Sequence, residues 1–70
     1  MVEKNVELTG TSTSSIEDAV ALAVSRASVT LAGIREATIT QTKALVEDGR
    51  VCGWKVTVKI AFLVQDQLHE

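Results

Sequence analysis

The side chains that most often carry chemistry are scarce in this chain. Cys52 is the only cysteine and His69 the only histidine among 70 residues. A single cysteine cannot form an intrachain disulfide, and one cysteine with one histidine cannot complete a zinc site. His69 lies one residue from the end of the sequence, which is a poor place to hold a catalytic base. The sequence therefore predicts no nucleophilic catalysis and no Cys/His metal centre within one chain.

Two short polar segments are candidates for ion binding. Glu47 and Asp48 are adjacent acids, but calcium takes about six to eight oxygen ligands, so only several copies around a symmetry axis would complete a site. The segment 10–14 precedes an expected helix start, where phosphates can bind, yet it lacks the lysine of a P-loop. Turn formation and helix capping are the simpler interpretations of these two segments.

Length and charge restrict the class of protein. Seventy residues form one domain, 1–70, with a thin core, and oligomerisation is the remaining way to stabilise it. The formal net charge of −2 and only two aromatic residues, Trp54 and Phe62, argue against nucleic-acid partners. No apolar run follows the initial Met-Val-Glu-Lys, so we expect neither a secretory signal nor a membrane span, and a cytoplasmic location.

The hydrophobic pattern places these residues on four elements. Alternation predicts a first strand from Val2 to Leu8, ended by the segment 10–13. Ser14 and Glu17 form a capping box at the start of a helix that ends near Gly33. The apolar stripe of this helix consists of Ile16, Val20, Ala23, Ala27 and Leu31. A second stripe, with Leu22 and Val29, predicts that the helix also contacts another subunit.

A hairpin follows the helix. Its first strand is expected over 35–45, with Ala37 and Ile39 on one face and Glu36, Thr38, Thr40 and Thr42 on the other. Asp48-Gly49 predicts the turn. The last strand, 51–64, places Trp54, Val56, Val58, Ile60 and Phe62 toward the core and Lys55, Thr57, Lys59 and Ala61 away from it. We expect Leu63 and Val64 to continue this strand toward a neighbouring subunit's sheet.

The expected fold class is α+β with the order β-α-β-β: one helix packed on a three-stranded antiparallel sheet whose long last strand lies in the middle. The opposite sheet face carries threonine, lysine and glutamate side chains. No second layer of this chain can cover that face, so we expect it to meet water, a ligand or another subunit.

At this point the sequence resembles the dodecin family. The residues that carry the resemblance are 6–12 (VELTGTS), 15–20 (SIEDAV), 27–28 (AS), 30–31 (TL), 47–51 (EDGRV) and 54–62 (WKVTVKIAF). They run in order through nearly the whole chain. The resemblance implies a hollow homo-dodecamer that binds and stores flavins, FMN or riboflavin, without catalysis. It also implies flavins stacked in pairs between symmetry-related tryptophans, with a glutamine on a neighbouring strand bonded to the ring system.

The chain departs from this pattern at both flavin-contacting positions. Glu36 stands where the resemblance places the stacking tryptophan, and Lys55 stands where it places the glutamine. Trp54 is then the neighbouring aromatic and belongs to the core face. Glu36 and Lys55 are expected on the same face of adjoining strands, paired with each other directly or across a subunit boundary. The residues 34–35 resemble a calcium-binding subgroup of the family, whose metal ligands do not carry over to named residues here.

We therefore predict a non-enzymatic dodecameric binding or storage protein whose flavin binding is weak or absent. The candidate ligand-binding residues are Glu36, Thr38, Lys55 and Thr57. The alternative is a calcium-binding or purely structural shell. The expected partners are copies of the same chain and a small molecule, with no nucleic acid and no membrane.

Overall fold

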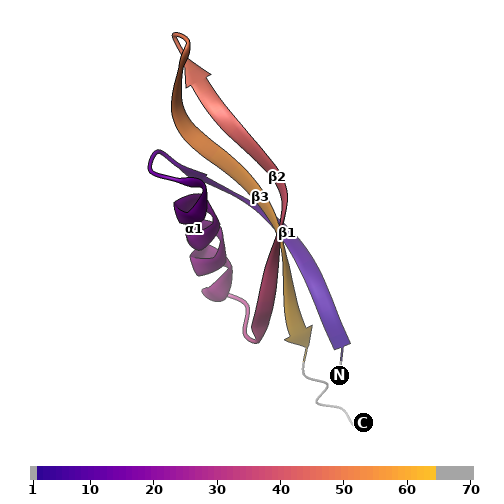
Figure 1. Cartoon of the computed structure of the whole chain (residues 1–70). Coiled ribbons are helices and arrows are strands. Elements are labelled where there is room, and N and C mark those ends of the chain that lie inside the picture. Colours follow the sequence, from indigo (N-terminus) through magenta and orange to yellow (C-terminus); the bar gives the residue numbers. More distant parts are fainter. Residues whose placement is uncertain (1, 65–70) are drawn as a thin grey trace, which may run out of the picture.

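The computed structural model describes residues 2–64, and its elements follow the predicted order. They are strand β1 (Val2–Ser12), helix α1 (Ile16–Ser28), strand β2 (Ile34–Glu47) and strand β3 (Arg50–Val64). The sheet has the order β1-β3-β2, and both pairings are antiparallel. Figure 1 shows α1 on one side of this sheet. The predicted fold class and the central place of the last strand are confirmed. His69 lies outside the described residues.

The first strand is longer than predicted because Gly10 does not break it. β1 continues to Ser12, and Gly10 pairs with Val56 in its interior. Gly10 faces α1, where a Cβ atom would come within 3.0 Å of the Ala19 carbonyl oxygen, closer than real Cβ atoms come. The missing side chain therefore allows the helix backbone to approach the strand.

The helix start is capped one residue later than the sequence pattern predicts. Ser15 is the N-cap, and its hydroxyl accepts a hydrogen bond from the Asp18 backbone N–H at 3.0 Å. The Ser12 hydroxyl donates to the Asp18 carboxylate at 2.6 Å and accepts the Ser14 backbone N–H at 2.9 Å. The predicted capping box at Ser14 is wrong, because the backbone N–H of Ser14 donates to the Ser12 hydroxyl and holds Ser14 in the turn before the helix.

The helix also ends before Gly33, contrary to the prediction. Its last residue is Ser28, and the backbone N–H groups of Thr30 and Leu31 both donate to the Ala27 carbonyl. These bonds satisfy the end of the helix. Gly33 instead has φ of +75°, and its carbonyl accepts the Leu63 N–H at 3.1 Å. The glycine thus turns the chain into β2.

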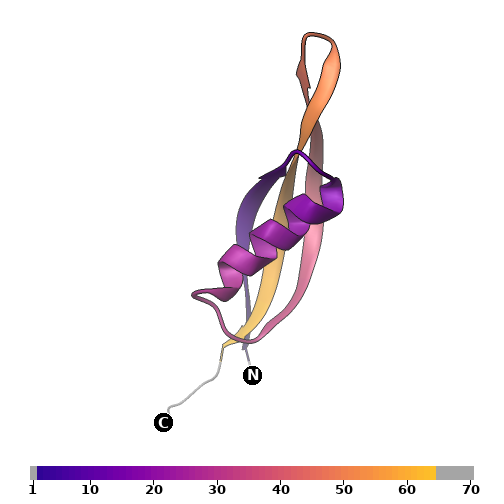
Figure 2. The ribbon, with the colours of Figure 1, turned by 90° about the vertical axis from the view of Figure 1, so that its left-hand side faces the viewer.

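The core between α1 and the sheet is thin. It consists of Ala19, Ala23 and Ala27 from the helix and Val56, Val58 and Ile60 from β3. Alanines allow the helix to lie close to the three branched side chains of the central strand. Trp54 and Phe62 lie on the predicted face but are only half-buried. Figure 2 shows α1 lying across this face of the sheet.

Strand β3 begins at a tight turn after β2 and ends beside the start of β1. Asp48 and Gly49 have φ of 51° and 75°, as a two-residue turn between antiparallel strands requires. Leu63 and Val64 pair with Glu3 and Val2 of their own β1. The predicted continuation of the strand through these residues is confirmed, and its contact with a neighbouring subunit's sheet stays a prediction.

Candidate functional site

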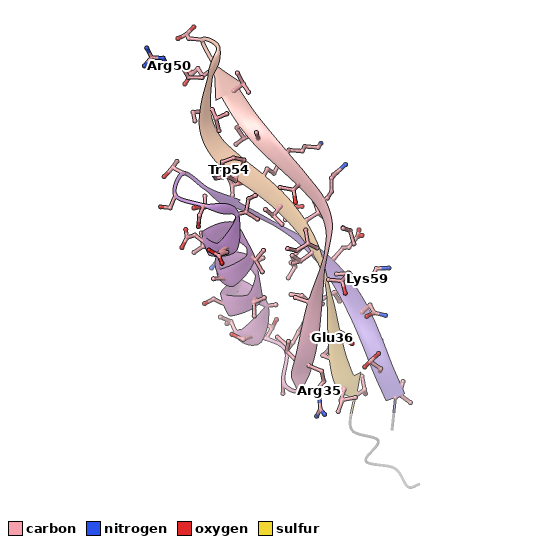
Figure 3. All side chains as sticks on the ribbon, viewed as in Figure 1. Arg35, Glu36, Arg50, Trp54 and Lys59 are labelled. Atoms are coloured by element: carbon pink, nitrogen blue, oxygen red, sulfur yellow. The ribbon has the colours of Figure 1, made fainter. Side chains whose placement is uncertain are left out.

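The candidate site is the sheet face that points away from α1, which we call the open face. Residues paired across antiparallel strands point to the same side of the sheet. Val56, Val58 and Ile60 face the helix, so the alternate β3 residues and their partners form the open face. From β3 it receives Lys55, Thr57, Lys59 and Ala61. Figure 3 shows Trp54 on the α1 side of the sheet and Lys59 on the other.

All four predicted site residues share the open face, but they do not form one cluster. Glu36 lies opposite Ala61, and Thr38 lies opposite Lys59. Lys55 is six residues from Ala61 along β3, which corresponds to roughly 20 Å at ~3.3 Å per residue. A direct Glu36–Lys55 pair within one chain is therefore wrong, because sharing a face does not place two residues at the same height. Their pairing across a subunit boundary stays a prediction.

A bulge at Thr40 changes which β2 residues reach the open face. Ile39 pairs with Val58 while Gln41 pairs with Thr57, so Thr40 is the extra residue. Beyond it, Gln41 and Lys43 point to the open face, whereas Thr42 pairs with Val56 on the helix side. The prediction that Thr42 joins the Glu36 face is wrong. No local sequence signal marks this bulge, so Gln41 and Lys43 were missed.

Threonine side chains join the strands at the middle of the open face. The Thr9 and Thr57 hydroxyls lie 3.3 Å apart. The Thr40 hydroxyl donates to the Thr57 carbonyl at 3.2 Å and so ties the bulge to the central strand. Through these contacts, Thr57 of the central strand is joined to both neighbouring strands.

Charges on the open face are arranged unevenly. Lys43 and Lys55 are directly opposite each other and both exposed, and like charges in this position destabilise a sheet. Further along β3, Lys59 lies opposite Glu7, which is a favourable pair of charges. One end of the open face is therefore positive and would favour an anionic group.

The open face offers no aromatic stacking surface. Trp54 and Phe62 are the only aromatic residues of the chain. Trp54 pairs with Ala44 and Ser12, and Phe62 with Ile34 and Lys4, all on the helix side. The face also lacks a nucleophile paired with a base among the described residues. The side chains that it does offer can bind a ligand through charge and hydrogen bonds.

The two ion-binding candidates gain no support within one chain. No group of three acidic, histidine or cysteine side chains able to hold a metal occurs between residues 2 and 64. At the helix start, the Asp18 carboxylate already accepts the Ser12 hydroxyl. A phosphate at this position would therefore meet the negative charge of the Asp18 carboxylate, and the backbone N–H groups of Ser14 and Asp18 already donate to serine hydroxyls.

The chain is a small α+β protein with one uncovered polar sheet face, and the comparisons with known proteins agree with this fold. The dodecin family model matches residues 2–65, so the chain belongs to the dodecin family. The dodecin of Streptomyces coelicolor is similar, with 35% identity, a TM-score of 0.87 and 94% of each chain covered.

Two further solved structures are similar over nearly their full length. The dodecin from Streptomyces davaonensis has 25% identity and a TM-score of 0.86, with 93% of this chain and 96% of that chain covered. A Thermus thermophilus protein has 27% identity and a TM-score of 0.88, covering 94% and 97% respectively. Among curated proteins, no match was found. Within residues 2–64, no helix has the length and apolar character to cross a bilayer.

Proposed function

We propose that this protein is a non-enzymatic, dodecameric small-molecule-binding member of its family in which flavin binding is weak or absent. The observation that carries the proposal is the open face itself, where Glu36 and Lys55 stand at the positions that the family resemblance gives to a tryptophan and a glutamine. Both aromatic side chains of the chain lie on the other side of the sheet.

The physical reason concerns Glu36. Stacking on an aromatic side chain is worth about 1–3 kcal/mol per ring in comparable nucleobase complexes. A carboxylate provides no such surface, and covering it with a flat apolar ring removes water from a charge. A flavin on this face would therefore lose stacking energy and meet a desolvation cost.

The positive end of the open face favours a different ligand group. Lys43 and Lys55 repel each other across the β2–β3 pair. An anionic group placed between them would relieve this repulsion. Such a group comes either from a small molecule or from the Glu36 carboxylate of another copy.

The proposal is tested by rebuilding the stacking site. In Glu36→Trp with Lys55→Gln, we expect FMN or riboflavin to bind at least about tenfold more tightly than to the unchanged protein, since 1.4 kcal/mol of stacking corresponds to that factor. Quenching of flavin fluorescence during titration measures the dissociation constant. The matched control is Glu36→Gln with Lys55→Gln, which removes both charges but adds no ring and should gain little affinity.

Two results would contradict the proposal. If the double variant assembles but quenches flavin no better than its control, Glu36 is not at a stacking position. If the unchanged protein is purified as a yellow twelve-subunit assembly with flavin bound in native mass spectra, its flavin binding is strong. A colourless assembly that gains mass with calcium would instead favour an ion-binding shell.

A further inference from the structure

The end of the β2–β3 hairpin extends beyond the rest of the sheet. The pairing of β1 with β3 ends at Ser12 and Trp54, so residues 45–53, which we call the arm, pair only with each other. Figures 1 and 2 show the arm projecting past α1. A two-stranded hairpin alone in water is marginally stable. The radius of gyration, 14.9 Å, exceeds the ~11 Å of a compact chain of this length.

The arm carries an apolar pair on its helix side. Val46 and Val51 pair with each other and are 63% and 55% exposed. Alternation along β2 places Val46 on the same side as Ala44, which pairs with Trp54 on the helix side. At the tip, Glu47 and Asp48 are exposed acids.

A complementary surface lies between α1 and β1. Two adjoining hollows of about 380 and 360 Å³ share Leu8, Arg26 and Val29 in their lining, and we call them together the helix groove. Leu22 and Val29, on its helix side, are 49% and 76% exposed. Among the described residues, Arg26 is the one charged side chain that lines either hollow. The groove is therefore an apolar surface with a single positive charge.

We propose that the arm of one copy packs Val46 and Val51 against Leu22 and Val29 in the helix groove of a second copy, with the acidic tip facing Arg26. Val46 and Val51 lie directly opposite each other across the hairpin, so they present one compact apolar patch to the groove. A contact within one chain is excluded, because the arm projects from the Ser12 end of the sheet, whereas Val29 is at the far end of α1.

This contact joins two different surfaces, so every copy has one arm to give and one groove to fill. Such head-to-tail interfaces form closed rings when the rotation between copies closes. The inference rests on the assembly in the proposed function but not on its ligand.

Cysteine cross-linking tests the contact directly. In a Cys52→Ser background, one protein carries Val46→Cys and a second, differently tagged, carries Val29→Cys. The two are co-expressed, treated with a short bis-maleimide and denatured, and the products are weighed by mass spectrometry. We expect dimers that contain one chain of each kind. Ala21→Cys is the matched control, since Ala21 is exposed on α1 but lines neither hollow, and should give no dimer with Val46→Cys.

The possible outcomes separate the alternatives. Dimers of two Val46→Cys chains or two Val29→Cys chains would overturn the proposal in favour of a symmetric contact, and an absence of dimers from an intact assembly would also overturn it. Native mass spectra of the untreated sample show whether the assembly exists at all, so failure of the proposed assembly is distinguished from failure of this contact.

Charge substitutions provide a second measurement. Val29→Glu, Leu22→Glu and Val46→Glu should each lower the mean assembly mass by half or more, with Ala21→Glu as the control that leaves it unchanged. Because all four side chains are exposed, far-ultraviolet circular dichroism should show the secondary structure retained. An unchanged mass for both Val29→Glu and Val46→Glu would refute the contact.

Discussion

Replacing Gly10 by alanine should push α1 away from the sheet. The new Cβ atom would come within 3.0 Å of the Ala19 carbonyl oxygen and 3.3 Å from the Ala23 Cβ. Ala19 is fully buried and Ala23 is 5% exposed, so neither side has free space. The closest atom belongs to the helix backbone, and no rotamer change can move it.

The size of the effect follows from the packing that is lost. Overpacking a filled core costs about 1–3 kcal/mol, and a gap of ~0.5–1 Å removes a quarter to a half of each contact along the displaced surface. Because the helix contributes half of the thin core, we expect a value near the upper end, about 3 kcal/mol. For a domain of this size, each kcal/mol lowers Tm by roughly 4–8 °C.

Thermal unfolding at fixed subunit concentration measures this loss, since assembly makes Tm depend on concentration. The half-buried Trp54 is the only tryptophan and reports unfolding by fluorescence. Gly49→Ala is the matched control: φ there is +75° and no atom lies within 4 Å of a new Cβ. It should cost only the ~1–2 kcal/mol of a left-handed residue. If Gly10→Ala lowers Tm no more than Gly49→Ala does, the close approach of α1 at Gly10 is not real.

Three smaller perturbations test other parts of the structure. Ser15→Ala should cost about 1 kcal/mol of unfolding free energy through loss of the N-cap, whereas Ser14→Ala should change it by less than ~0.5 kcal/mol; the reverse order in chemical denaturation would restore the predicted capping box. Ile60→Val, at a fully buried position, should cost about 0.5–1.5 kcal/mol by the same assay, and no loss would place Ile60 outside the core. Lys43→Gln should stabilise the protein by less than ~1 kcal/mol at low salt and by less at high salt, because it removes repulsion with Lys55; a gain independent of salt would point to another cause.

The sequence by itself determined the order of elements, the central strand and the inward face of that strand. These features depend on local signals: the alternation through Val56, Val58 and Ile60, the helical spacing of Ala23 and Ala27, and the Asp48-Gly49 turn. The scarcity of cysteine and histidine also restricted the possible chemistry, because composition alone limits which side chains can act together. The family resemblance depended on the same segments, and the family match over residues 2–65 confirmed it.

Tertiary structure decided the composition of the open face. An alternating pattern assigns faces correctly only until a bulge, and the extra residue at Thr40 moves Thr42 to the helix side and Lys43 to the side of Lys55. The strand register places Glu36 opposite Ala61, far along the sheet from Lys55. This register could not be predicted, because the pairing between distant segments is not encoded in either strand alone. Likewise, Gly10 reads as a strand breaker in sequence, but contact with α1 makes it a position in the strand where only hydrogen fits.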